Sequence, residues 1–334
     1  MSSVYLGIDT SNYRTSVAAV DESGNVIFQK AVLLDVAQGE RGLRQSDAFF
    51  KHSNRLPDHL RELLMEIDNS AVAAVGVSER PRRVEGSYMP CFMAGVNAAN
   101  ILGSAIDVPV YGFSHQEGHA AAILESDNAV PPEESLFFHL SGGTTEALLC
   151  RPDENGYSME IAGGTLDISI GQLIDRFGVA IGMPFPSGQY LDDIAYKALE
   201  DFSFDTDLIT KSGVMPKLRI KDGYFNLSGA ETRLMKYAGS HTDDEDNASV
   251  IAELFASMAK LLADEAAYLS DKYNIKDIYM AGGVASSRTV RKLLSAVKES
   301  DIKFGDAALS GDNAVGTALL AKRIHETGKR NPGK

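Results

Sequence analysis

The chain has no tryptophan and only two cysteines, Cys91 and Cys150, among its 334 residues. Two cysteines are too few for a disulfide framework or an all-cysteine metal site, which favours a reducing, cytoplasmic environment. Long hydrophobic runs are also missing, because an apolar stretch such as residues 71–77 is far shorter than the about 20 residues that a membrane span needs. No cleavable signal region precedes the first strand-like segment. We therefore expect no membrane association.

Basic side chains are outnumbered, with 32 Lys and Arg against 46 Asp and Glu and a net charge of −14. Binding to nucleic acid by charge alone needs clustered Lys and Arg, so this balance disfavours it, although a local patch or helper subunit could still engage an RNA. The one tight basic cluster outside the carboxyl tail is Arg80, Arg82 and Arg83. It either grips a phosphate or carboxylate, or lines a solvated loop. The acidic run 243–246 is expected to cap a long helix.

The pattern of strands indicates an α/β protein with about two lobes. Residues 4–11, 15–20 and 26–30 predict a three-stranded meander, and residues 136–140, 145–150 and 157–162 repeat the layout. Matching meanders predict two related lobes. Periodicity predicts further elements between and after them. The expected helices are 56–67, 91–106, 169–182, 190–201, 248–273 and 288–300, the further strands are 71–78, 108–113 and 277–281, and 202–229 is expected to be irregular.

Three turns of small residues follow predicted buried strands, at residues 9–11, 141–144 and 282–287. Glycine lets backbone N–H groups approach an anion closely, and hydroxyls add donors. Asp9 suits a metal or water beside phosphate, and the third turn opens a helix whose amino end favours a nucleotide. Their order resembles the phosphate, phosphate and adenosine layout of the actin, sugar-kinase and Hsp70 superfamily. This resemblance implies a two-lobed actin-like ATPase (ASKHA) fold, with two ribonuclease-H-like lobes around a central cleft, divided into 1–113 plus 314–334 and 114–313.

A histidine pair lies in the segment His115-Gln116-Glu117-Gly118-His119. Its i, i+4 spacing puts both imidazoles on one helix face, where they can hold a divalent transition metal with room for oxygen ligands. It is not the zincin signature, which needs Glu directly after the first His. An exposed pair or a helix cap remains the alternative. Asp312, just before the apolar run 314–321, indicates a helix N-cap when taken alone.

Six motifs occur together: His-x-Glu-Gly-His, Ser-Gly-Gly-x-Thr, Gly-x-x-x-Asp, Pro-x-Gly, Ala-Gly-Gly-Val-Ala and Asp-Asn. In this combination, residues 7–321 resemble a divergent member of the tRNA N6-adenosine threonylcarbamoyltransferase family, formerly the O-sialoglycoprotein endopeptidase or glycoprotease family. The resemblance implies one Fe²⁺ or Zn²⁺ ion bound by His115, His119 and Asp312, with an adenine nucleotide or adenylate beside it. The implied substrate and nucleotide contacts are Leu140, Ser141, Gly142, Gly143, Thr144, Asp175, Gly188, Gly282, Gly283 and Ser287.

The resemblance also implies the reaction. The threonylcarbamoyl group of threonylcarbamoyl-adenylate passes to N6 of an adenosine in tRNA, AMP leaves, and the metal acts as a Lewis acid. Asp9, Asn12 and Thr144 lie at the implied catalytic positions, Asn12 within the region of the family's acidic pair and Thr144 at its metal-side histidine. The implied partners are tRNA, a related non-catalytic subunit and a small ATPase, in a homo- or heterodimer in the cytoplasm.

The chain departs from the family mainly at proton-moving groups. Asn12-Tyr13-Arg14 replaces the acidic pair, Gln172 a glutamate, Ser287 an asparagine, and residues 79–83 a Gly-Pro-Gly loop. Tyr13 and Arg14 cannot replace a carboxylate base at neutral pH. Two alternatives therefore stay open: a divergent paralogue that acts as a carbamoyltransferase on another acceptor, and a non-catalytic regulatory partner that binds nucleotide and metal. A protease is disfavoured, because no nucleophile is accompanied by a base and an orienting acid.

Overall fold

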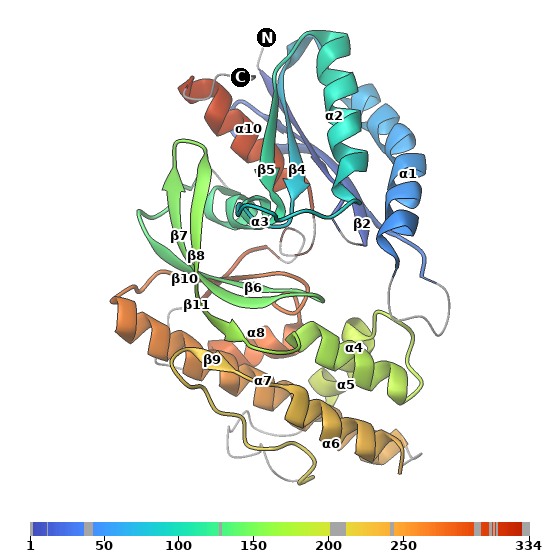
Figure 1. Ribbon diagram of the computed structural model, residues 1–334, viewed down its shortest axis with the longest axis vertical. Coiled ribbons are helices and arrows are strands. Elements are labelled where there is room, and N and C mark those ends of the chain that lie inside the picture. The colour runs from blue at the N-terminus through green and yellow to red at the C-terminus, as the bar shows by residue number, and fades with distance from the viewer. Residues whose placement is uncertain are drawn as a thin grey trace.

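Two sheets form the framework of the protein, seen in a computed structural model (Figure 1). The structure describes residues 3–11, 13–36, 43–126, 129–200, 212–240, 244–296, 302–306, 309, 311 and 313–328. The first sheet has the strand order β3-β2-β1-β4-β5, and the second has the order β11-β10-β6-β7-β8-β9. The predicted α/β class and its two meanders are confirmed, because β1-β2-β3 and β6-β7-β8 are both antiparallel.

The first sheet is covered on both faces. Strand β1 is wholly buried, and its side chains alternate between two cores. Leu6 and Ile8 pack with helices α1 and α2, whereas Tyr5 packs with α3 and α10 on the other face. The elements are β1 (Val4–Asp9), β2 (Arg14–Asp21), β3 (Val26–Leu33), α1 (Gln45–Glu66), η1 (Asn69–Ala71), β4 (Val72–Arg80), α2 (Phe92–Ile106), β5 (Val110–Ser114), α3 (His115–Leu124) and α10 (Val315–Thr327).

The second sheet has a thick helical layer on one face and shares α3 and α10 with the first sheet on the other (Figure 1). Strand β6 shows the division, since Phe138 packs with the helical layer and Phe137 with α3 and α10. The elements are β6 (Ser135–Leu140), β7 (Thr145–Asp153), β8 (Gly156–Thr165), α4 (Ile170–Ala180), α5 (Gly188–Glu200), β9 (Tyr224–Phe225), α6 (Ser228–Ala238), α7 (Asp244–Tyr273), β10 (Ile278–Ala281), α8 (Arg288–Ser295) and β11 (Ile302–Phe304).

Helix α10 approaches its neighbours at backbone distance. A Cβ at Gly7 of β1 would overlap the carbonyl oxygen of Ala314, and one at Gly76 of β4 would overlap that of Thr317. A Cβ at Gly316 would likewise overlap the backbone of α3. Glycine at these positions therefore allows α10 to lie directly on the first sheet and on α3.

Several predicted boundaries were wrong. Helix α1 begins at Gln45 rather than at residue 56, because its polar first half still buries Ala48 and His52 at helical spacing. The segment 202–229, predicted to be irregular, contains β9 and the start of α6, although residues 201–211 lie outside the described residues. Helix α7 begins within the predicted acidic run, whose side chains are not described. The predicted lobe boundaries stay a prediction.

The predicted lack of disulfide bonding agrees with the structure, in which Cys91 and Cys150 are both buried and neither forms a disulfide bond. Among the residues described, no helix has the combination of length and apolar character that spanning a membrane would need.

Candidate metal and nucleotide site

The first turn of α3 fixes the histidine pair. The side chain of Ser114 accepts a hydrogen bond from Glu117 N at 3.3 Å, and the Glu117 carboxylate accepts one from Ser114 N at 2.8 Å. This capping box sets the start of the helix at His115. His115 and His119 consequently lie on one helix face, as their spacing predicts, with their Nε2 atoms 3.0 Å apart.

A third imidazole joins the pair from the second sheet. His139 of β6 is buried, and one ligand nitrogen from each of the three histidines lies within 4.8 Å of the others. The ring centroids of His119 and His139 are 4.7 Å apart. Sequence reasoning missed His139, although an imidazole in an otherwise apolar strand, two residues before a glycine turn, was a usable signal. Asp312, the third predicted ligand, lies outside the described residues.

Asp9 orients His115. Its Oδ2 lies 2.9 Å from His115 Nδ1 and accepts a 2.5 Å hydrogen bond from the hydroxyl of Ser78, while Oδ1 accepts from the hydroxyl and backbone N–H of Ser11. Burial acts to raise the pKa of Asp9, but His115 and the donated hydrogen bonds outweigh it, so the pKa is lowered. With Nδ1 engaged by a carboxylate, Nε2 of His115 is the nitrogen directed to the cluster, an arrangement typical of metal-binding histidines.

The donor set fits a divalent transition metal. Imidazole nitrogens bind zinc at about 2.0–2.1 Å, so two tetrahedral ligands lie about 3.3 Å from each other. The 3.0 Å separation in the histidine pair is close to that value. Nitrogen ligands are also those that zinc and iron accept readily. Three histidines with one carboxylate behind them can therefore hold such an ion.

Two glycine turns meet at the carboxyl ends of β6 and β10, which are neighbouring parallel strands. Ser141 and Thr144 close the first turn through a 2.8 Å hydrogen bond from Ser141 N to Thr144 O. The second turn is anchored to the first, because Val284 N donates to Leu140 O at 2.9 Å. Gly142, Gly143 and Gly283 are exposed and have open space where a side chain would be. Phosphate oxygens can approach such backbone closely.

The predicted ribose-side residues lie on α4 and α5. Asp175 accepts a 2.7 Å hydrogen bond from Ser187 N and a backbone hydrogen bond from Gly188, where α5 begins. Burial raises the pKa of Asp175, and the two hydrogen bonds, which lower it, do not cancel this effect. Helix α4 itself abuts the first glycine turn, because Ser169 Oγ donates to Gly142 O at 2.8 Å. Gln172 completes the capping box with Ser169 at the start of α4.

Ser287 caps α8 and is held by a residue that the sequence analysis missed. The Ser287 hydroxyl donates to Asp192 Oδ1 at 2.5 Å and accepts from Val290 N. Asp192, on α5, also accepts from Arg288 N at 2.9 Å and from Thr289 N at 3.1 Å. Its carboxylate thus secures the amino end of α8, which is favourable for a negative charge.

The predicted catalytic region around Asn12 is described only in part, because Asn12 itself lies outside the described residues. The ring of Tyr13 packs edge-on against Phe185, with 5.9 Å between centroids, and so bridges the first sheet's β1–β2 turn and the loop before α5. The backbone N–H of Thr144 donates to Ser141 Oγ at 3.1 Å. Thr144 has no imidazole, and the third histidine near His115 and His119 is His139 of β6, which lies outside the glycine turn.

The arginine cluster forms internal ion pairs. Arg83 binds Asp153 at 2.8 Å and lies 3.5 Å from the buried carboxylate of Glu117, and Arg82 pairs with Glu146. These contacts join the β4–α2 connection to strand β7 and its turn. Such half-buried ion pairs differ from both predictions, which were arginines that bind a phosphate or carboxylate of a ligand and arginines that line a solvated loop.

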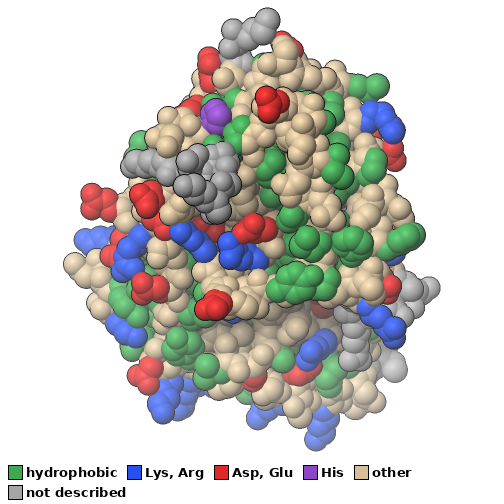
Figure 2. Space-filling view, turned by 45° about the horizontal axis from the view of Figure 1, so that its top comes forward, with side chains coloured by type: hydrophobic (Ala, Val, Ile, Leu, Met, Phe, Trp, Pro, Cys, Tyr) green, Lys and Arg blue, Asp and Glu red, His purple; other side chains and the backbone are tan. Residues whose placement is uncertain are grey.

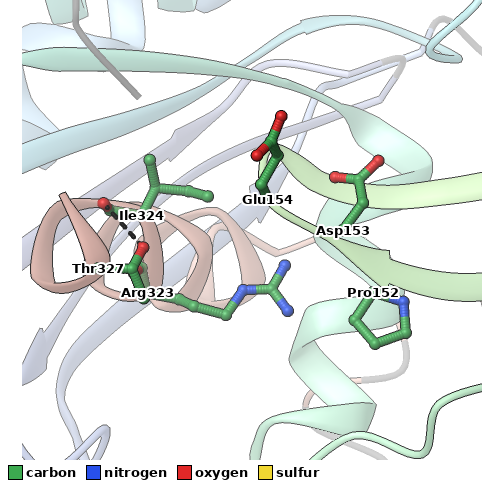
Figure 3. Close-up of a pocket in the computed structure, with 6 residues that line it drawn as sticks. All are labelled: Pro152, Asp153, Glu154, Arg323, Ile324 and Thr327. Carbon is green, nitrogen blue, oxygen red and sulfur yellow. Dashed lines mark hydrogen bonds between the residues drawn. The ribbon is translucent and has the colours of Figure 1, made fainter. Parts of the chain in front are cut away.

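A separate pocket lies between the β7–β8 turn and α10, away from the glycine turns (Figure 3). It is lined by Pro152, Asp153, Glu154, Arg323, Ile324 and Thr327. The guanidinium of Arg323 donates to Gly156 O at 2.6 Å and pairs with Glu125 at 3.2 Å. We ascribe a structural role to Arg323, because these contacts hold α10 against the β7–β8 hairpin.

Comparisons with known proteins indicate one family and one fold. A family model described as tRNA N6-adenosine threonylcarbamoyltransferase matches residues 34–319. Proteins of that name from Bacillus thuringiensis and Thermotoga neapolitana are 29% and 27% identical to this chain, covering 99% and 97% of it and 96% and 94% of their own lengths. The structure is similar to component A of Acidaminococcus fermentans (R)-2-hydroxyglutaryl-CoA dehydratase, with a TM-score of 0.50, 16% identity, and coverage of 97% and 99%. That likeness confirms the predicted actin-like fold.

Proposed function

Because the chain belongs to the tRNA N6-adenosine threonylcarbamoyltransferase family, we propose that it transfers the threonylcarbamoyl group from threonylcarbamoyl-adenylate to N6 of adenosine in tRNA. The observation that carries the proposal is the meeting of the histidine pair of α3 with His139, beside two open glycine turns. The three histidines suit a metal and the glycine turns suit a phosphate, and an adenylate-dependent acyl transfer uses both.

In this proposal His115, His119 and His139 hold a divalent ion, Fe²⁺ or Zn²⁺, with Asp9 orienting His115. When bound, such an ion supplies Lewis-acid stabilisation of charge on a carbonyl or phosphate oxygen. Asp312 stays a proposed ligand from the family resemblance.

The adenylate would extend from this cluster across the two turns. Backbone N–H groups of Gly142, Gly143 and Gly283 are proposed to hold the phosphate, because no side chain blocks them. Asp175 and Gly188 would lie at the ribose, and Ser287 at the base. Holding the carbamoyl carbon and the attacking amine in line supplies much of the rate.

Recognition of tRNA is proposed to need help from a related subunit or an ATPase. Figure 2 shows one face of the molecule, on which basic side chains are interspersed with acidic ones. The chain carries a net charge of −14, so electrostatic attraction to RNA is weak overall. Work on tRNA in this way also fits a cytoplasmic location.

The test is a transfer assay with purified protein, chemically made threonylcarbamoyl-adenylate and unmodified tRNA, alone and with candidate partner subunits. We expect modified adenosine and AMP in equal amounts. Supplying carbamoyl-adenylate with small-molecule acceptors in parallel tests the alternative acceptor. AMP release without a modified acceptor, or binding without any AMP release, would contradict the proposal and favour the regulatory partner.

A further inference from the structure

Glu146 of β7 lies beside the three-histidine cluster by strand register. It is the residue directly opposite His139 in the antiparallel β6–β7 pair. Side chains that face each other across two antiparallel strands are on the same side of the sheet, with Cβ atoms about 4.5–5.5 Å apart. His139 faces His119 of α3, so Glu146 also faces α3.

Contacts from both sides hold the Glu146 carboxylate in place. Gln116, located between the two histidines on α3, donates its Nε2 to Glu146 Oε2 at 2.8 Å. Arg82, from the β4–α2 connection, pairs with the other oxygen, Oε1. The side chain of Glu146 is only 13% exposed, whereas that of Arg82 is 40% exposed. A largely buried carboxylate is thus tied to the histidine motif and to a partly solvated cation.

The cluster needs such a charge. A divalent ion held by three neutral imidazoles and the proposed ligand Asp312 still carries one positive charge, and a buried ion without full compensation is costly. Asp9 is shared among His115, Ser11 and Ser78. Glu117 is turned away, since it accepts from Ser114 N and from Tyr157 N.

We propose that Glu146 is a further carboxylate that helps to compensate the charge of a divalent cation in the three-histidine cluster, and that Arg82 competes with this cation for it. The proposal rests on the metal centre of the proposed function. Glu146 is a positioning residue here and acts on the ion through Gln116 or water, because its carboxylate is not among the ligand atoms that lie within 4.8 Å of one another. When a cation is bound, Arg82 is released from Glu146, which couples metal occupancy to the β4–α2 connection.

The experiment measures Zn²⁺ affinity by competition with a chromogenic chelator, on metal-free protein. Glu146→Gln keeps the shape and the bond from Gln116 but removes the charge, and we expect affinity to fall about 10- to 100-fold. Arg82→Gln should tighten binding about two- to five-fold, in keeping with a partly exposed pair. In the Glu146→Gln background the same Arg82 change should have no effect. Glu160→Gln, on the exposed side of β8, is the matched control and should bind as wild type.

The outcomes separate this inference from the proposed function. Wild-type affinity in Glu146→Gln, or an equal effect of Arg82→Gln in both backgrounds, overturns the role of Glu146 while the metal centre stands. A wild-type protein that binds no Zn²⁺ overturns the metal centre itself. If Glu146→Gln does not fold, Glu146→Asp decides, and an unchanged Zn²⁺ affinity together with an unchanged visible spectrum of the cobalt-loaded protein refutes the inference.

Discussion

Replacing Gly282 by alanine should loosen the turn proposed to bind the adenylate. Gly282 has a φ of +100°, a backbone conformation that costs a residue with a side chain about 1–3 kcal/mol. The new Cβ would also overlap the carbonyl oxygen of Leu140, which accepts the hydrogen bond from Val284 N. Losing that bond adds about 1 kcal/mol. We expect the free energy of unfolding to fall by about 2–4 kcal/mol in total.

The neighbouring glycine provides the control. Gly283 has no positive φ, and a Cβ there meets open space. Gly283→Ala should therefore leave the free energy of unfolding within about 1 kcal/mol of wild type. Because its methyl group faces the proposed phosphate, it should still weaken binding of a non-hydrolysable adenylate. Urea unfolding followed by circular dichroism, with calorimetric titration of the adenylate, compares the two variants; equal destabilisation by both would refute the reasoning.

Three further predictions concern single carboxylates. Burial raises the pKa of Glu265 from its ordinary 4.5 to about 8, so the folded state holds this proton more tightly than the unfolded state does. Wild-type stability should consequently fall as the pH rises from about 4.5 to about 8, and denaturation across that range should find a flatter profile for Glu265→Gln. Asp9→Asn should weaken Zn²⁺ binding about 10- to 100-fold by releasing Nδ1 of His115, while unchanged affinity in the chelator assay would contradict its orienting role. Asp192→Ala removes three hydrogen bonds at the start of α8 and should cost about 2–3 kcal/mol on urea unfolding, whereas Asp193→Ala, which loses one exposed ion pair, should cost less than about 1 kcal/mol.

The strongest sequence signals concerned local chemistry. The capped i, i+4 histidine pair and the glycine turns at strand ends were predictable, because spacing and turn residues determine them within a few positions. The roles of His139 and Glu146 were not predicted, because they depend on which strand lies next to α3. Register between β6 and β7 joins them, and a single sequence does not display that pairing.

Long-range pairing also explains the remaining differences. The cluster Arg80, Arg82 and Arg83 is conspicuous in the sequence. The acidic partners of Arg83, however, lie at least 34 residues further along the chain. Helix α1 was predicted too short because the buried side chains of its first half are few and partly polar. The polar contacts of Asp192 with α8 span 95 residues or more, so only the folded chain reveals them.

The close contacts of α10 have a consequence for synthesis on the ribosome. Strands β1 and β4 emerge early, yet Gly7 and Gly76 find their partners only when residues 314–317 have been made. Until then one apolar face of the first sheet lacks the cover that α10 provides, and such a nascent half-domain is prone to aggregate. Completion of this lobe therefore waits for α10, and a chain that stops before residue 314 leaves β1, its first strand, without this native partner.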